Sequence, residues 1–82
     1  MERQTLVKVD LGTASRLQAE TFHKQMESRG WRAMPEFPST FCTTIRGNST
    51  DEEIVEATEE DATWSAELAR IYNWDAVCII ED

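Results

Sequence analysis

The fold is decided by a β-rich run near the start of the chain, Thr5-Leu6-Val7-Lys8-Val9-Asp10-Leu11. Its side chains alternate between an apolar side and a mixed side, which is the two-residue period of a β-strand. The two sides consist of Val7, Val9 and Leu11, and of Leu6, Lys8 and Asp10. The run therefore predicts a strand, and the glycine at position 12 ends it.

Residues 14–29 follow the period of a helix. Their apolar stripe consists of Ala19, Phe22 and Met26. His23 lies beside this stripe, and Gly30 follows where a C-terminal cap is expected. The pattern predicts one helix that packs its stripe against a sheet.

A second helix is predicted over residues 50–72. Two overlapping capping boxes mark its start, because Ser49 with Glu52 and Thr50 with Glu53 both have the required spacing. On a helical wheel the side predicted to face the core consists of Ile54, Thr58, Ala62, Trp64, Ser65, Leu68, Ala69, Ile71 and Tyr72. The opposite, solvated side carries Glu52, Glu56, Glu59, Glu60 and Glu67.

Three further extended segments complete the pattern. Residues 31–34 are followed by two prolines, which suit an edge strand. Residues 39–46 form the next strand, which Gly47 breaks. The last strand, residues 74–80, is apolar at every position from Ala76 to Ile80, and this pattern predicts burial of both its faces.

The order strand, helix, strand, strand, helix, strand is typical of the α+β ferredoxin-like fold, βαββαβ, with two helices on one face of an antiparallel sheet. We expect one such domain over residues 1–82. In the usual strand order, 4-1-3-2, Cys42 and Cys78 lie roughly 9–10 Å apart, too far for a disulfide. The open face of the sheet is then expected to carry Leu6, Lys8, Asp10, Cys42, Thr44 and Arg46.

The charge of the chain is unevenly distributed. The net charge is −8, but residues 1–50 carry +2, whereas residues 51–82 carry eleven acids and a single arginine. Nucleic-acid binding over the whole surface and docking on an anionic membrane are therefore disfavoured, because both need net basic contacts. A local nucleic-acid site in the first half stays open.

Composition also indicates where the protein acts. The first 20 residues lack the apolar core of a signal peptide, and no run is long enough to span a membrane. The two cysteines form no metal-binding motif, and we interpret both as small buried side chains. We expect a protein of the reducing cytoplasm, without a membrane partner.

Few residues carry recognisable chemistry. Asp10, near the end of the first strand, is a candidate metal ligand or acid/base, against simple solvation or a salt bridge with Lys8 or Arg46. His23 is the one side chain that ordinarily titrates near neutral pH, but its place beside an apolar stripe favours a packing role. Nucleophile elbows and phosphate loops are absent from the sequence.

Two strands resemble those of the GhoS-type antitoxins, small ferredoxin-like endoribonucleases related in fold to VapD and to the nuclease subunit of CRISPR spacer acquisition. The resemblance rests on Val7-Lys8-Val9-Asp10-Leu11 and Ser39-Thr40-Phe41-Cys42-Thr43-Thr44-Ile45, and covers roughly residues 5–60. It implies an RNA-acting antitoxin or regulator, a homodimer, with Asp10 as the metal-linked catalytic residue. The cofactor stays open, with Mg²⁺ as the candidate. Lys8, Arg32 and Arg46 are the expected phosphate contacts.

The acidic second helix supports a different class of function. Its carboxylates could imitate a phosphate backbone and occupy a nucleic-acid-binding protein, as in a non-enzymatic inhibitor or adaptor of phage or mobile-element type. The partner-binding residues would then be the five glutamates of the solvated side. A third hypothesis is an interaction domain whose open sheet face pairs with itself.

Overall fold

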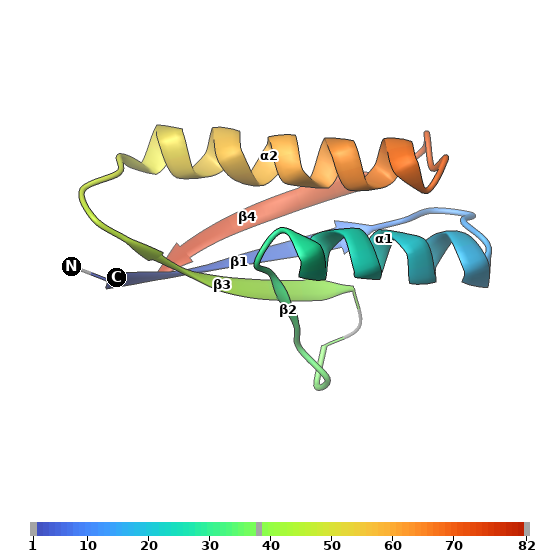
Figure 1. Cartoon of the computed structure of the whole chain (residues 1–82), viewed down its shortest axis with the longest axis horizontal. Helices are drawn as coiled ribbons and strands as arrows, with labels where there is room; N and C mark the ends of the chain where they lie inside the picture. Colours follow the sequence, from blue (N-terminus) through green and yellow to red (C-terminus); the bar gives the residue numbers. More distant parts are fainter. Residues whose placement is uncertain (1, 38, 82) are drawn as a thin grey trace.

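The computed structural model describes residues 2–37 and 39–81 and contains two helices and four strands (Figure 1). In chain order they are β1 (Glu2–Asp10), α1 (Arg16–Ser28), β2 (Arg32–Ala33), β3 (Thr40–Arg46), α2 (Asp51–Leu68) and β4 (Asp75–Glu81). The strands form one antiparallel sheet in the order β2-β3-β1-β4, and both helices cover the same face of it (Figure 1). The predicted α+β ferredoxin-like fold and its strand order are confirmed.

The register of the sheet assigns each side chain to one of two faces. Val7 of β1 pairs with Phe41 on one side and Cys78 on the other, and this row faces the helices. Leu6 pairs with Cys42 and Ile79, and this row lies on the open face. The two cysteines therefore lie on opposite faces of the sheet. Both are free, as predicted, and half-buried rather than fully buried.

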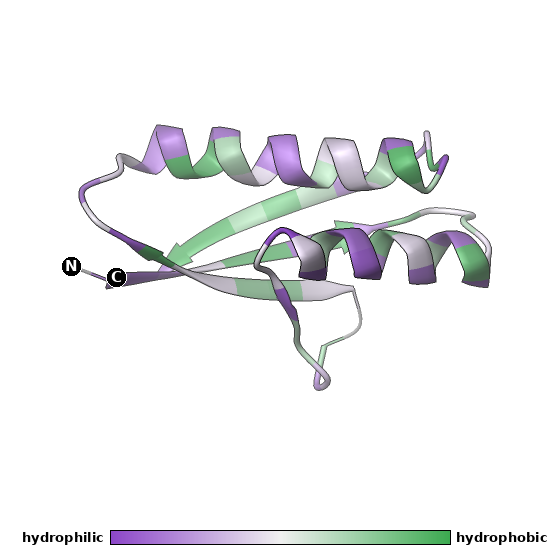
Figure 2. Ribbon diagram, in the orientation of Figure 1, coloured by the Kyte–Doolittle hydropathy of each residue, from purple (hydrophilic) through white to green (hydrophobic). Residues whose placement is uncertain are grey.

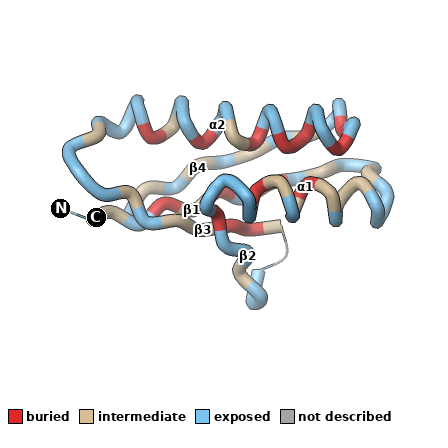
Figure 3. Tube along the Cα trace, viewed as in Figure 1, coloured by how far each residue is buried: buried red, intermediate tan, exposed pale blue. Residues whose placement is uncertain are grey.

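The core lies between the sheet and the helices. α2 turns its buried side to the sheet and its exposed side to solvent (Figure 3). The buried cluster consists of Val7, Val9, Phe22, Met26, Trp31, Phe41, Ala66, Ala69 and Ile71. Burial of these large apolar side chains is the main stabilising term, since removal of apolar surface from water contributes about 25 cal/mol per Å².

Both helices start at a capping box. Ser15 and Gln18 form the one at α1, and at α2 the pair that forms is Thr50 with Glu53. The Thr50 N–H donates to the Glu53 carboxylate at 3.0 Å, and the Glu53 N–H donates to the Thr50 hydroxyl at 3.2 Å. The Thr50 backbone N–H, and then the Thr50 side chain, lowers the pKa of Glu53 from its ordinary value, because each forms a hydrogen bond to the Glu53 carboxylate.

Both helices also end in the same motif. At the end of α1, Trp31 N–H donates to Met26 and Gly30 N–H donates to Glu27, with Gly30 in the left-handed region at φ 92°. At the end of α2 the corresponding donors are Ile71 and Arg70, and Arg70 takes the left-handed position at φ 59°. This turn ends α2 at Leu68, four residues before the predicted end.

Two predictions about burial were wrong. Trp64, Leu68 and Tyr72 were assigned to the core side of the second helix, but they are 49%, 53% and 80% exposed. The first two lie on the outer side of α2, and Tyr72 lies beyond its end. β4, apolar along most of its length (Figure 2), was expected to bury both faces, yet it is an edge strand with Val77 57% and Ile79 48% exposed.

Among the residues that the structure describes, no helix has both the length and the apolar character required to cross a bilayer.

Candidate functional site

The candidate site lies where β1 ends and β4 begins. Asp10 is the last residue of β1, Asp75 is the first of β4, and the two are direct partners in the antiparallel register. Both belong to the open-face rows and both are exposed. Directly opposed residues have Cα atoms about 4.5–5.5 Å apart, so the register places two carboxylates side by side.

Backbone hydrogen bonds orient both carboxylates. Asp10 Oδ1 accepts from the N–H of Gly12 at 2.9 Å, and Asp75 Oδ1 accepts from the N–H of Ala76 at 2.9 Å. Each side chain thus has one oxygen held by the chain, which leaves its Oδ2 for a ligand. The pair lies at a shallow cavity of about 260 Å³ that Lys8, Val9, Ala76 and Val77 complete.

The chemistry of this pair suits one kind of metal site. The described part of the chain has no group of three or more His, Cys, Asp or Glu side chains that could hold an ion by themselves. Mg²⁺ is commonly bound through one or two carboxylates together with substrate phosphates and water, rather than by an all-protein cage. Asp10 and Asp75 fit the arrangement in which two carboxylates bind the ion together with phosphate and water.

The three predicted phosphate contacts share the open face but not one location. Lys8 precedes Asp10 by two residues on β1, so the two side chains point the same way, roughly 7 Å apart along the strand. Arg32 pairs with Cys42 and lies across the sheet on β2. Arg46 pairs with Glu2, eight residues or roughly 27 Å from Asp10 along β1.

The structure also shows whether Asp10 forms a salt bridge with Lys8 or Arg46, as the sequence left open. Arg46 forms an ion pair with Glu2 at 3.2 Å, at the opposite end of the sheet from Asp10. Lys8 forms no ion pair with any residue that the structure describes. Neither proposed salt bridge is present, so Asp10 is a solvated carboxylate beside a second one.

His23 has a packing role. Its ring meets Phe41 edge-on at a centroid distance of 4.8 Å, and the residue is half-buried on the helix side of the sheet. Asp10 lies on the opposite face, so the sheet separates the two. The structure thus supports the interpretation of His23 as part of the helix packing.

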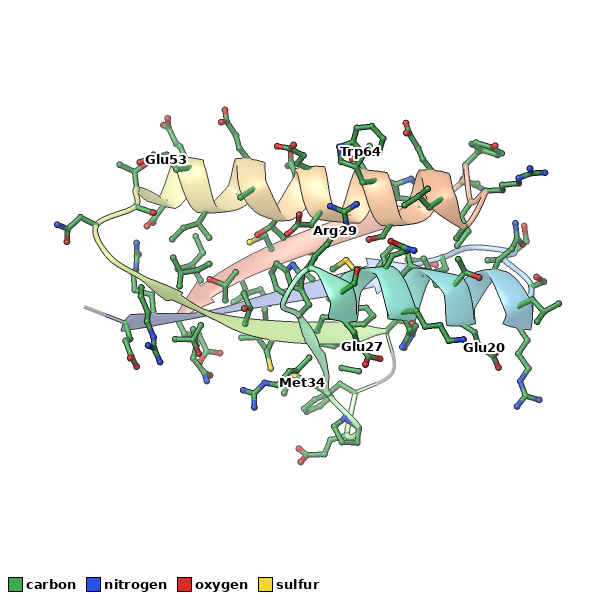
Figure 4. All side chains as sticks on the ribbon, viewed as in Figure 1. Glu20, Glu27, Arg29, Met34, Glu53 and Trp64 are labelled. Carbon is green, nitrogen blue, oxygen red and sulfur yellow. The ribbon has the colours of Figure 1, made fainter. Side chains whose placement is uncertain are left out.

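The second predicted surface lies on α2. Its five glutamates, Glu52, Glu56, Glu59, Glu60 and Glu67, are all exposed. Trp64 interrupts them and points away from the sheet, as does Glu53 (Figure 4). The outer side of α2 is therefore acidic and carries an exposed aromatic ring.

Asp75 is the site residue that sequence reasoning missed. The sequence did contain a signal for Asp75. An aspartate at the end of the first strand and another at the start of the fourth strand meet if those strands are antiparallel neighbours. The predicted strand order contained that information. Comparison with protein-family models, curated proteins and solved structures finds no match to the chain.

Proposed function

We propose that the protein acts on RNA in the cytoplasm as a small antitoxin-like or regulatory protein, and that it cleaves RNA as a metal-dependent endoribonuclease. The observation that carries the proposal is the register pairing of Asp10 with Asp75 on the open sheet face. The paired carboxylates, an adjacent lysine and the shallow cavity together suit a phosphodiester bound with a divalent ion.

Each side chain would have a separate role at such a site. Asp10 and Asp75 would hold Mg²⁺ through the oxygens that the backbone leaves unused. Lys8 would contact the phosphate beside the ion, and Arg32 would contact the RNA strand farther across the sheet. The bound ion supplies Lewis-acid stabilisation of charge on the scissile phosphate.

The distribution of charge is compatible with this site. Most acids of the second half lie on α2, which packs on the other face of the sheet. Between exposed charges more than about 10 Å apart, salt at 0.1 M screens most of the repulsion. The acidic helix therefore does not prevent RNA from approaching the open face.

Cleavage of a labelled single-stranded RNA, with Mg²⁺ and with EDTA, tests the proposal. Asp10→Asn and Asp75→Asn should each abolish cleavage in Mg²⁺. Glu81→Gln is the matched control, because Glu81 lies on the open face at the far end of the same strand. Absence of Mg²⁺-dependent cleavage by the wild-type protein would refute an enzyme, and full activity in both aspartate variants would refute the assignment of the site to Asp10 and Asp75.

A second candidate function is supported by a specific observation on α2. Trp64 and Leu68, four residues apart on one helix side, are about half exposed among glutamates. Tryptophan is enriched at the centres of protein interfaces, and acids around it favour a basic partner. On this alternative the protein is a non-enzymatic inhibitor or adaptor that occupies a nucleic-acid-binding protein through its glutamate-rich helix.

Capture of host proteins on the immobilised chain distinguishes the two functions. The double reversal Glu56→Lys with Glu60→Lys, and separately Trp64→Ala, should release a basic protein partner. The control is Glu27→Lys with Glu36→Lys, since both acids are exposed and lie outside α2. Nuclease treatment of the lysate separates a protein partner from RNA, and capture unchanged by the α2 variants would remove this alternative.

A further inference from the structure

A second cavity lies at the same end of the sheet as the aspartate pair. It measures about 240 Å³ and lies between the loop that follows β1 and the loop that precedes β4. Its apolar side is formed by Leu11, Ala14 and Ile71, and its polar side includes Arg70, Tyr72 and Asn73. Drug-sized ligand pockets usually measure about 300–1,000 Å³, so this cavity suits a single flat ring.

The two loops are held together without a ligand. Gly12 has φ 60°, and a Cβ atom at this position would lie 2.5 Å from the carbonyl oxygen of Asn73. Gln18 of α1 donates its side-chain N–H to the Arg70 carbonyl oxygen at 2.9 Å. Because these contacts are already present, a ligand would meet a cavity that needs little ordering.

Arg70 occupies an unusual position beside this cavity. It takes the left-handed place that a glycine occupies at the end of α1, although such a conformation is unfavourable for residues with a Cβ atom. It is the only Lys or Arg in residues 51–82. It forms no ion pair with the described residues, so its charge is available to an anion.

Tyr72 adds an aromatic surface two residues farther along. Its side chain is 80% exposed at the rim of the cavity, although aromatic rings gain most from burial. An exposed ring next to a free guanidinium is the combination that binds single-stranded nucleic acid, with stacking on the base and attraction to the phosphate.

The cavity lies at the same end of the sheet as the aspartate pair, although the two share no lining residue. Leu11 follows Asp10 in the chain, and Asn73 precedes Asp75 by two residues. The hydrogen bond from Gly12 N–H to Asp10 Oδ1 turns that carboxylate toward the same loop. An RNA strand with its phosphate at the aspartates would therefore bring a neighbouring nucleotide to this cavity.

We propose that the cavity binds one base of single-stranded RNA, stacked on Tyr72, with Arg70 on the adjacent phosphate and the Asn73 side-chain amide facing the base edge. The proposal rests on the function proposed above, because it assigns the cavity to the same RNA strand. It names single-stranded RNA as the substrate, since a paired base could not enter the cavity.

Binding of short single-stranded RNA to the full chain, measured by fluorescence anisotropy in EDTA and in Mg²⁺, tests the proposal. Tyr72→Ala should weaken binding roughly 5- to 150-fold, the usual range for loss of one stacked base. Tyr72→Phe should bind like the wild type, because phenylalanine keeps the ring. Phe37→Ala removes another exposed aromatic ring, far from both loops in sequence, and should have no effect.

Arg70 and Asn73 give independent readouts. Arg70→Gly should reduce the slope of log affinity against log salt by about 0.7, and Arg70→Lys should retain the slope. Asn73→Ala should alter the preference among oligomers of A, C, G and U, with a smaller change in mean affinity.

The outcomes separate this proposal from the proposed function. Wild-type binding that Tyr72→Ala and Arg70→Gly leave unchanged overturns the base cavity and leaves Asp10 and Asp75 untouched. Loss of binding in these variants without cleavage by the wild type supports the cavity and removes the nuclease. A wild-type chain that binds no single-stranded RNA refutes both.

Discussion

Asp10 and Asp75 are direct cross-strand partners, so two carboxylates of like charge share the end of the open sheet face. Like charges in this relationship destabilise a sheet, and a sequence selected for stability alone would avoid them. A divalent ion between them would reverse the sign of the interaction, because each carboxylate would then face a cation.

The first prediction concerns the cost of this pair. Asp75→Asn should increase the free energy of unfolding by about 0.2–1 kcal/mol in metal-free buffer. Asparagine keeps the Oδ1 acceptor for the Ala76 N–H, so only the charge changes. Urea denaturation in EDTA and in Mg²⁺ measures the effect, and Mg²⁺ should stabilise the wild type more than the variant. A less stable variant in EDTA would contradict the prediction.

A second prediction concerns the start of α2. Thr50→Ala removes the hydroxyl that accepts from Glu53 N–H and should cost about 1 kcal/mol in the free energy of unfolding. Ser49→Ala is the control, because Ser49 belongs to the alternative capping box that does not form. An equal loss in the two variants would show that the cap observed here is not the stabilising one.

The third prediction is a pH dependence. The pKa of Glu53 is lowered in the folded chain by its bonds to Thr50, so the folded state favours the carboxylate. The resulting stability is fully present above the ordinary glutamate pKa and is lost as the pH falls through the lowered value. The midpoint of urea denaturation should therefore change less with pH over this acidic range in Glu53→Gln than in the wild type. Glu52→Gln should show the same pH dependence as the wild type.

A fourth prediction concerns the contact between α2 and the loop after α1. The buried Trp31 indole N–H donates to Asp61 Oδ2 at 2.9 Å. Asp61→Ala leaves this donor without its partner and should cost about 1–3 kcal/mol in the free energy of unfolding. Glu60→Ala, an exposed neighbour, should change stability by no more than about 0.5 kcal/mol. Equal effects would show that the indole finds water instead.

The fifth prediction separates stability from binding at Arg70. Arg70→Gly relieves the left-handed backbone but increases the freedom of the unfolded chain, so the net gain in stability should be about 0.5–1 kcal/mol. Thermal unfolding measures the gain. A variant that is more stable yet binds RNA less well would identify Arg70 as a residue kept for its side chain.

Most elements of this fold are determined by local sequence. The alternation from Thr5 to Leu11, the apolar stripe of α1 and the capping box at Thr50 each involve residues within a few positions of one another. Hydrogen bonds and side-chain spacing within a single strand or helix decide such features, so the element order and the fold class could be predicted. Asp10 could be identified for the same reason, as a carboxylate at the end of a β-rich run.

Other properties depend on contacts between distant segments. The helical period placed Trp64 and Leu68 on the core side, but α2 turns both outward and buries Ala66, which was not predicted, beside the predicted Ala62 and Ser65. These small side chains let the helix approach the sheet. The apolar pattern of β4 indicates a buried strand, yet its place at the sheet edge leaves Val77 exposed.

The candidate site shows the same division. By itself the sequence determined the fold class, the acidic outer side of α2 and the single aspartate at the end of β1. The pairing of Asp10 with Asp75, and the cavity between the loops of Gly12 and Asn73, were decided only by the tertiary structure. Both join segments more than 60 residues apart, and their register follows from packing the whole sheet against two helices.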